Sequence, residues 1–108
     1  MANEYLDKLV IGDVLVGCYS YNTTFYDFYE VVGKTASSVK LQKLGKSYDP
    51  NGTQMNTRVK PQFKTKVGKP FTRRVTKSYV MEDGKWSTCI RLEGKYNKDT
   101  TYSENYMD

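Results

Sequence analysis

The sequence predicts an all-β protein, built as a small antiparallel, partly closed barrel (SH3-like or OB-like) of about five or six strands, with room for a short N-terminal helix. Three observations lead to this fold class. Segments rich in β-branched and aromatic residues recur along the chain, turn-forming residues separate them, and the connections are too short for crossover helices. A chain of 108 residues can bury one modest core, so residues 1–108 are expected to form a single domain.

The expected elements follow one another along the chain. At the N-terminus, Asn3 can cap one or two helical turns that end near Leu9. Asp49-Pro50-Asn51-Gly52 and Asp83-Gly84 are expected to form tight turns, because Pro50 presets φ for a turn and the Asn51-Gly52 and Asp83-Gly84 pairs accept positive φ angles at low cost. The expected strands cover residues 12–20, 25–34, 38–44, 54–61, 72–80 and 87–92.

Alternation within these strands predicts which side chains are buried. Successive side chains of a strand point to opposite faces, so apolar residues at every second position mark the face that is turned to the core. Most of the expected strands are half buried by this criterion, with polar side chains on the outer face. The expected core consists of Val16, Val31, Leu41, Val59, Val75 and Ile90.

The segment YNTTFYDFYEVV, residues 21–32, breaks the alternation because both of its faces are apolar. One face carries Phe25 and Tyr29, and the other carries Tyr26 and Phe28. Such a strand is either covered on both sides, or it has a core on one side and an exposed aromatic platform on the other. Both alternatives are open at the level of the sequence.

The same segment resembles the signature Y-(D/N)-x-T-x-x-D-F-Y-x-V-V of a family of small, uncharacterised proteins from bacteriophages, plasmids and their hosts. Further along, residues 59–75 resemble the V-x-P and G-x-P-x-x-R-R-V stretches of that family, and the resemblance covers about residues 12–80. It implies a mobile-element origin and a small all-β domain, and no particular reaction. By analogy, compact phage proteins often bind nucleic acid or block a host defence protein.

An enzyme is not expected. The chain has no histidine, which excludes histidine-based nucleophile pairs, histidine general bases and histidine-ligated metals. No cofactor or metal is therefore expected. Cys18 and Cys89 are far apart in the sequence and lack C-x-x-C spacing, so both are expected to be reduced.

Membrane association is not expected either. No apolar stretch approaches the roughly 20 residues that span a bilayer, and the first residues lack the pattern of a signal peptide. We therefore expect a protein of the host-cell cytoplasm.

Charge is distributed unevenly along the chain. Residues 34–77 contain twelve basic side chains and one acid, whereas residues 1–33 contain one basic side chain and five acids. Alternation places several of these cations on outer faces, where a joint patch of three strands would attract polyanions. The residues expected to contact nucleic acid or another partner are Lys40, Arg58, Lys60, Lys64, Lys66, Arg73, Arg74, Lys77 and Tyr26.

Arg73 and Arg74 are expected to have different roles, because adjacent residues of a strand point to opposite faces. One arginine joins the basic surface, where its planar guanidinium can hold a phosphate with two hydrogen bonds. The other needs a partner inside the protein, for example an acid such as Asp13, Asp27 or Glu30.

Two functions fit these observations. The first is a non-enzymatic accessory protein of a phage or plasmid that binds nucleic acid through a basic face, with bases stacked on tyrosines. The alternative is an inhibitor of the anti-CRISPR type that binds a host nucleic-acid-binding protein. The oligomeric state is not predicted by the sequence.

Overall fold

The computed structural model describes residues 4–21, 23–48, 56–82, 88–97 and 102–106. In this part of the chain the protein is all-β except for one short helix, as the sequence predicts. Asn3 and the two expected turns, at residues 49–52 and 83–84, lie outside the described residues. The elements are α1 (Glu4–Asp7), β1 (Val14–Tyr21), β2 (Thr23–Lys34), β3 (Ser38–Tyr48), β4 (Asn56–Lys66), β5 (Phe71–Arg74), β6 (Tyr79–Glu82), β7 (Thr88–Lys95) and β8 (Tyr102–Tyr106).

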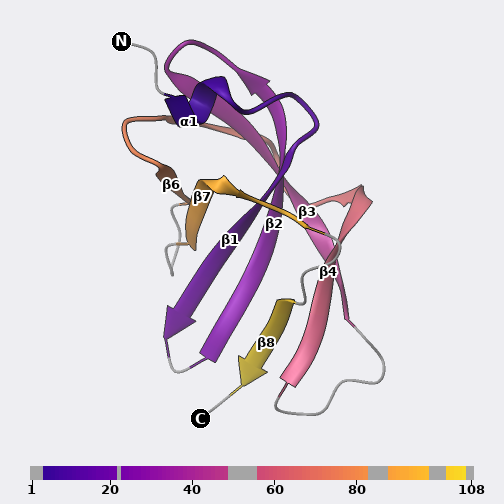
Figure 1. Ribbon diagram of the computed structural model, residues 1–108. Helices are drawn as coiled ribbons and strands as arrows, with labels where there is room; N and C mark the ends of the chain where they lie inside the picture. The colour runs from indigo at the N-terminus through magenta and orange to yellow at the C-terminus, as the bar shows by residue number, and fades with distance from the viewer. Residues whose placement is uncertain (1–3, 22, 49–55, 83–87, 98–101, 107–108) are drawn as a thin grey trace.

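All of these strands belong to one antiparallel sheet, whose order is β5-β3-β4-β8-β2-β1-β7-β6. The two long strands β2 and β3 organise the sheet, because each changes neighbours along its length. β2 pairs with β1, β3 and β8, and β3 pairs with β2, β4 and β5. As a result, β4 and β8 lie together at one end of the molecule, and α1 lies at the other end (Figure 1).

The sheet is not closed into a barrel, so the expected SH3-like or OB-like closure is wrong. Within the described residues the end strands β5 and β6 share no backbone ladder. The single strand expected over residues 72–80 is in fact two strands, because β5 pairs with β3 whereas β6 pairs with β7 at the opposite end of the order. The sequence also does not predict β8, because its five residues, YSENY, include Glu and Asn, which are depleted in strands.

Buried side chains form two clusters. Phe28 and Tyr29 are adjacent in β2, have no exposed surface and belong to different clusters, so β2 is covered on both faces at this point. The larger cluster contains Leu6, Leu9, Leu15, Tyr29, Val31, Val39, Leu41, Val75, Val80, Ile90 and Leu92. The smaller cluster contains Val14, Phe28, Leu44 and Val59.

The prediction of the core is confirmed with one exception. Val31, Leu41, Val59, Val75 and Ile90 are buried. The exception, Val16, is only partly buried and packs against the smaller cluster. Of the two alternatives for the aromatic segment, the covered strand is therefore correct at Phe28 and Tyr29.

Gly17 marks a close approach between β1 and the larger cluster. A Cβ atom at this position would lie 2.7 Å from Cε2 of Tyr29 and 2.8 Å from Cγ2 of Thr88. We expect Gly17→Ala to lower the free energy of unfolding by about 1 to 3 kcal/mol, because the added methyl group overpacks the core. Urea denaturation measures the change.

Gly33→Ala is the matched control for this substitution. The nearest side-chain atom to a Cβ at Gly33 is Cβ of Lys40 at 3.5 Å, which is an ordinary contact. A much smaller change is therefore expected, and equal losses of stability at the two glycines would contradict the packing described around Gly17.

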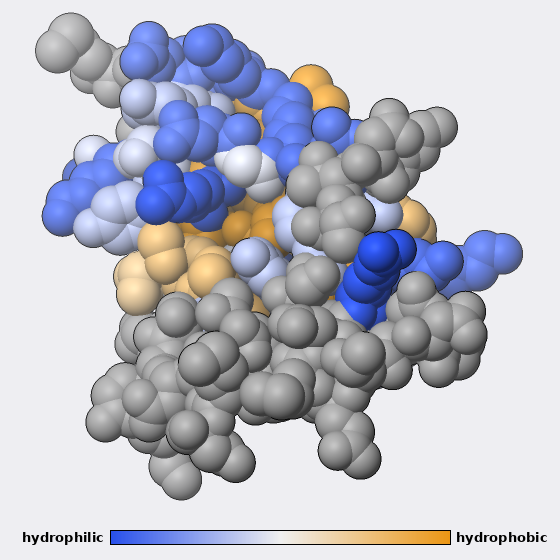
Figure 2. All heavy atoms as spheres, turned by 60° about the horizontal axis from the view of Figure 1, so that its bottom comes forward, coloured by the Kyte–Doolittle hydropathy of each residue, from blue (hydrophilic) through white to orange (hydrophobic). Residues whose placement is uncertain are grey.

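Hydrophilic residues cover most of the described surface on the side shown in Figure 2, and hydrophobic residues show between them. No helix in the described ranges is long and apolar enough to cross a membrane. Large hydrophobic side chains that remain exposed are Val10, Ile11, Tyr48, Phe63, Val67 and Tyr79.

Candidate nucleic-acid interface

An open cleft of about 340 Å³ lies where the end strands β5 and β6 meet. We call it the β5–β6 cleft. Three of its residues, Arg73, Arg74 and Lys77, are cations that the sequence predicts as partner-binding residues. The complete lining is Arg73, Arg74, Thr76, Lys77, Tyr79, Val80 and Met81.

Two buried valines fix the segment that connects β5 to β6. Val75 and Val80 are each 5% exposed and belong to the larger cluster. The Val75 amide donates to the Ser37 carbonyl at 2.8 Å, and the Ser78 carbonyl accepts from the amide of Leu92 at 2.9 Å. The residues between these anchors remain at the surface, which leaves Lys77 exposed at the cleft.

Arg73 points toward the core side of β5 and has a structural role. It lies opposite the buried Val39 in the β3–β5 ladder, and its guanidinium carbon sits 4.8 Å from the centre of the Phe71 ring. Its Nε donates to the Met81 carbonyl at 2.9 Å, and its Nη1 donates to the Thr72 carbonyl at 3.1 Å. Arg73 therefore joins β5 to β6 through main-chain carbonyls.

Arg74 points the other way and is exposed, as the alternation of strand residues predicts. It lies opposite Ser38 in β3, and Lys40 lies opposite Thr72. Arg74 and Lys40 are consequently diagonal neighbours on one face of the sheet, with a separation of about 7 Å between such positions. Lys40 thus extends the positive surface of the cleft onto β3.

Tyr79 adds an aromatic surface to these cations. Tyr79 is 38% exposed, and the Lys77 ammonium lies 5.6 Å from the centre of its ring. A cation over a tyrosine ring is held by the ring quadrupole, which keeps the charge at the cleft. Guanidinium and ammonium groups can bind phosphate oxygens, and an exposed ring can stack on a base.

A polar network holds β6 in place behind the cleft. The Tyr29 hydroxyl in β2 donates to the Glu82 carboxylate in β6. The Lys43 ammonium lies 3.9 Å from Glu82 and 3.7 Å from Asp27, and the Lys46 ammonium lies 3.4 Å from Asp27. These contacts join β2, β3 and β6, so they position the strand that carries Tyr79.

Burial, together with the hydrogen bond to Glu82, raises the pKa of Tyr29 far above its ordinary value of 10.0. Above pH 10 the unfolded chain loses this proton while the folded protein keeps it, so stability falls as the pH rises. We expect the stability advantage of the wild type over Tyr29→Phe to shrink by about 1.4 kcal/mol per pH unit above pH 10. Urea denaturation of both proteins below and above pH 10 measures it, and a difference that does not change with pH would contradict the network.

The remaining predicted cations lie elsewhere, so the single three-strand patch expected from the sequence is divided. Lys60 lies opposite Ser47 in β3, whereas the cleft adjoins β3 at Lys40. These positions are seven residues apart, or about 23 Å along the strand. Arg58, Lys60, Lys64 and Lys66 are exposed on β4 and form a second basic group.

Tyr26 also lies away from the cleft. Its ring packs edge to face against Tyr102 of β8, with 5.6 Å between the ring centres, and it lines a separate cavity. Tyr79 and Tyr102 are not among the site residues that the sequence predicts. The interleaving of cations and a ring in RRVTKSY, residues 73–79, is the sequence signal that favours Tyr79.

Comparisons with known proteins do not add a family. The chain matches no protein-family model, no curated protein and no solved structure. In the described residues, no group of three or more Cys, Asp or Glu side chains is placed to hold a metal ion. The resemblance of residues 21–32 to a mobile-element family stays a prediction, and function must be inferred from the geometry of the cleft.

Proposed function

We propose that this protein binds nucleic acid through the β5–β6 cleft and that it has no enzymatic activity. One observation carries the proposal: two exposed cations, Arg74 and Lys77, line one open cleft together with the exposed Tyr79. Phosphate contacts with counterion release would provide most of the affinity, and base stacking on Tyr79 would add to it.

A single strand fits this cleft better than a duplex. In a duplex the bases are stacked on one another, so Tyr79 would have no base face to contact. A single strand can follow Arg74, Lys77 and Lys40 with its phosphates and place a base on the ring. The resemblance of residues 21–32 to phage and plasmid proteins supports a role as a mobile-element accessory protein that acts in the host cytoplasm.

The alternative proposal is an anti-CRISPR type of inhibitor that binds a host nucleic-acid-processing protein. It is favoured by two adjacent exposed apolar residues, Val10 and Ile11, which are 59% and 68% exposed. A protein partner would cover such residues, whereas a nucleic acid would not. In this case the cleft would imitate or oppose the surface that normally holds nucleic acid.

Fluorescence anisotropy with labelled single-stranded and duplex oligonucleotides tests the proposed function. We expect the single strand to bind more tightly, with log affinity falling linearly with log salt at a slope of about −2 if three phosphates are neutralised. Absence of binding at low salt would contradict nucleic-acid binding. The inhibitor would be supported instead if the protein does not bind oligonucleotides and co-purifies with a host nuclease from a lysate whose nucleic acid has been digested.

A further inference from the structure

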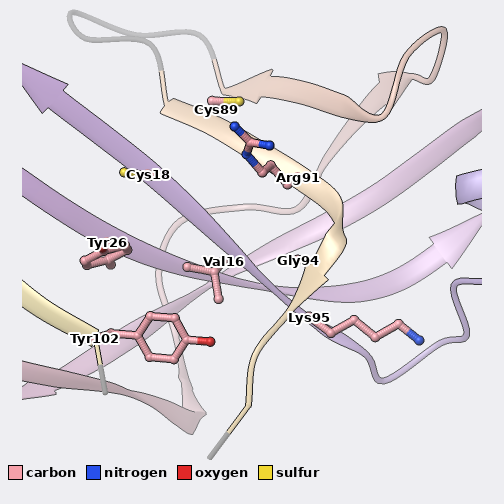
Figure 3. Close-up of a pocket in the computed structure, with 8 residues that line it drawn as sticks. All are labelled: Val16, Cys18, Tyr26, Cys89, Arg91, Gly94, Lys95 and Tyr102. Atoms are coloured by element: carbon pink, nitrogen blue, oxygen red, sulfur yellow. The ribbon is translucent and has the colours of Figure 1, made fainter. Parts of the chain in front are cut away.

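A second cavity, of about 420 Å³, lies among β1, β2, β7 and β8 (Figure 3). Its volume lies within the range of small-molecule sites, which is roughly 300 to 1,000 Å³. We call it the tyrosine cavity. It is lined by Val16, Cys18, Tyr26, Cys89, Arg91, Gly94, Lys95 and Tyr102.

Aromatic rings form one wall of the tyrosine cavity. Tyr26 and Tyr102 lie on the same side of the cavity in Figure 3. Tyr102 also packs against Tyr96, with 5.6 Å between ring centres. The ring of the buried Phe28 contacts both, with 5.5 Å between the ring centres of Phe28 and Tyr96 and 5.7 Å between those of Phe28 and Tyr102. This wall is backed by the smaller core cluster, so a planar group would meet a preformed aromatic surface.

Arg91 is the cation of the cavity that is placed to meet an anion. Its side chain is 70% exposed, and its ion pair with Glu93 is long, at 3.8 Å. The Lys95 ammonium, in contrast, lies 3.0 Å from Asp13 and points away from the two tyrosines (Figure 3). A ligand for this cavity therefore combines a planar apolar part with one negative group.

Two thiols also line the cavity. Cys18 and Cys89 lie opposite each other in the β1–β7 ladder, and both are free. Burial, and the neighbouring Cys89, raise the pKa of Cys18 above its ordinary value. The thiol is consequently protonated at pH 7 and presents no charge that would repel a phosphate.

We propose that the tyrosine cavity binds one nucleotide unit of a bound single strand, with the base against Tyr26 and Tyr102 and the phosphate at Arg91. The choice of a nucleotide rests on the proposed function, because a base and a phosphate are the planar and anionic parts that such a strand offers. The aromatic wall provides stacking, and the guanidinium provides hydrogen bonds to phosphate.

The two cysteines, which are the only ones in the chain, report directly on this cavity. The experiment measures the rates at which N-ethylmaleimide modifies each thiol, by mass spectrometry, with and without nucleoside monophosphates at millimolar concentration. We expect the nucleotides to slow modification of both cysteines, and inorganic phosphate alone to leave the rates unchanged. Unchanged rates with every nucleotide would overturn the proposal.

Variants separate the two parts of the ligand. Arg91→Gln and Tyr26→Leu should each raise the nucleotide concentration that gives half-maximal protection by about tenfold. Arg91→Gln loses the phosphate contact, and Tyr26→Leu loses a stacking ring. Arg58→Gln, which removes an exposed cation of β4, is the matched control and should protect like the wild type. If nucleosides protect as well as nucleotides and Arg91→Gln changes nothing, the phosphate site at Arg91 is ruled out.

The double variant Arg74→Glu/Lys77→Glu distinguishes this proposal from the proposed function. It should lose oligonucleotide binding at the cleft while nucleoside monophosphates still protect the thiols. If the wild type binds oligonucleotides but nucleotides do not protect its thiols, nucleotide binding at the cavity is overturned and the function of the cleft stays intact. Thiol protection without oligonucleotide binding would overturn the proposed function of the cleft and leave nucleotide binding at the cavity intact.

Discussion

Replacing Phe28 by alanine is expected to lower the free energy of unfolding by about 3 to 5 kcal/mol, because a large ring is lost and a cavity remains. Phe28 has no exposed surface and packs with Val14, Leu44 and Val59. Its ring also supports Tyr96 and Tyr102, at centre-to-centre distances of 5.5 and 5.7 Å. Urea denaturation, followed by circular dichroism, measures the loss.

Val10→Ala is the control for this substitution. Val10 is 59% exposed, so its truncation should change stability by no more than about 0.5 kcal/mol. A Phe28→Ala protein as stable as the control would mean that the ring is exposed. The aromatic segment would then be a stacking platform at Phe28, contrary to the structure.

Charge reversal at the β5–β6 cleft is expected to have the largest effect on binding. The double variant Arg74→Glu/Lys77→Glu should weaken binding of a single-stranded oligonucleotide by about a hundredfold or more, because two charged hydrogen bonds are lost and repulsion replaces them. Both side chains are exposed, so stability should change by no more than about 0.5 kcal/mol. Anisotropy titration and thermal unfolding of the same samples measure the two effects.

Arg58→Glu/Lys60→Glu is the matched control, with the same change of charge on β4. Both residues are exposed, and Lys60 lies about 23 Å along β3 from Lys40, where β3 adjoins the cleft. This variant should lose much less affinity, through long-range electrostatics that salt screens. Equal losses for the two double variants would indicate that net charge, and not the cleft, determines binding.

Local sequence patterns predict much of the sheet because they depend on neighbouring residues. β-branched and aromatic side chains mark β1, β2, β3 and β7 within a few residues of their observed bounds. The two apolar faces of residues 21–32 predict either a covered strand or an exposed aromatic platform, and the structure shows that the strand is covered at Phe28 and Tyr29. Opposite directions of Arg73 and Arg74 follow from the same alternation.

Features that depend on distant pairing could not be predicted in this way. The length of β3 lets it pair first with β5 and then with β4, which opens the expected barrel and divides the expected basic patch. β8 pairs with β4 and β2 although its own sequence is polar. The bond from Tyr29 to Glu82 joins residues far apart in the chain, and no local pattern connects them.

An NMR titration locates the binding surface residue by residue. Isotope-labelled protein is titrated with an unlabelled single-stranded oligonucleotide at low salt, and the change in each backbone amide signal is recorded. We expect the largest changes at residues 73–81 and at Lys40, with small changes at Arg58 and Lys60. Changes centred on β4 that leave residues 73–81 unaffected would contradict binding at the β5–β6 cleft.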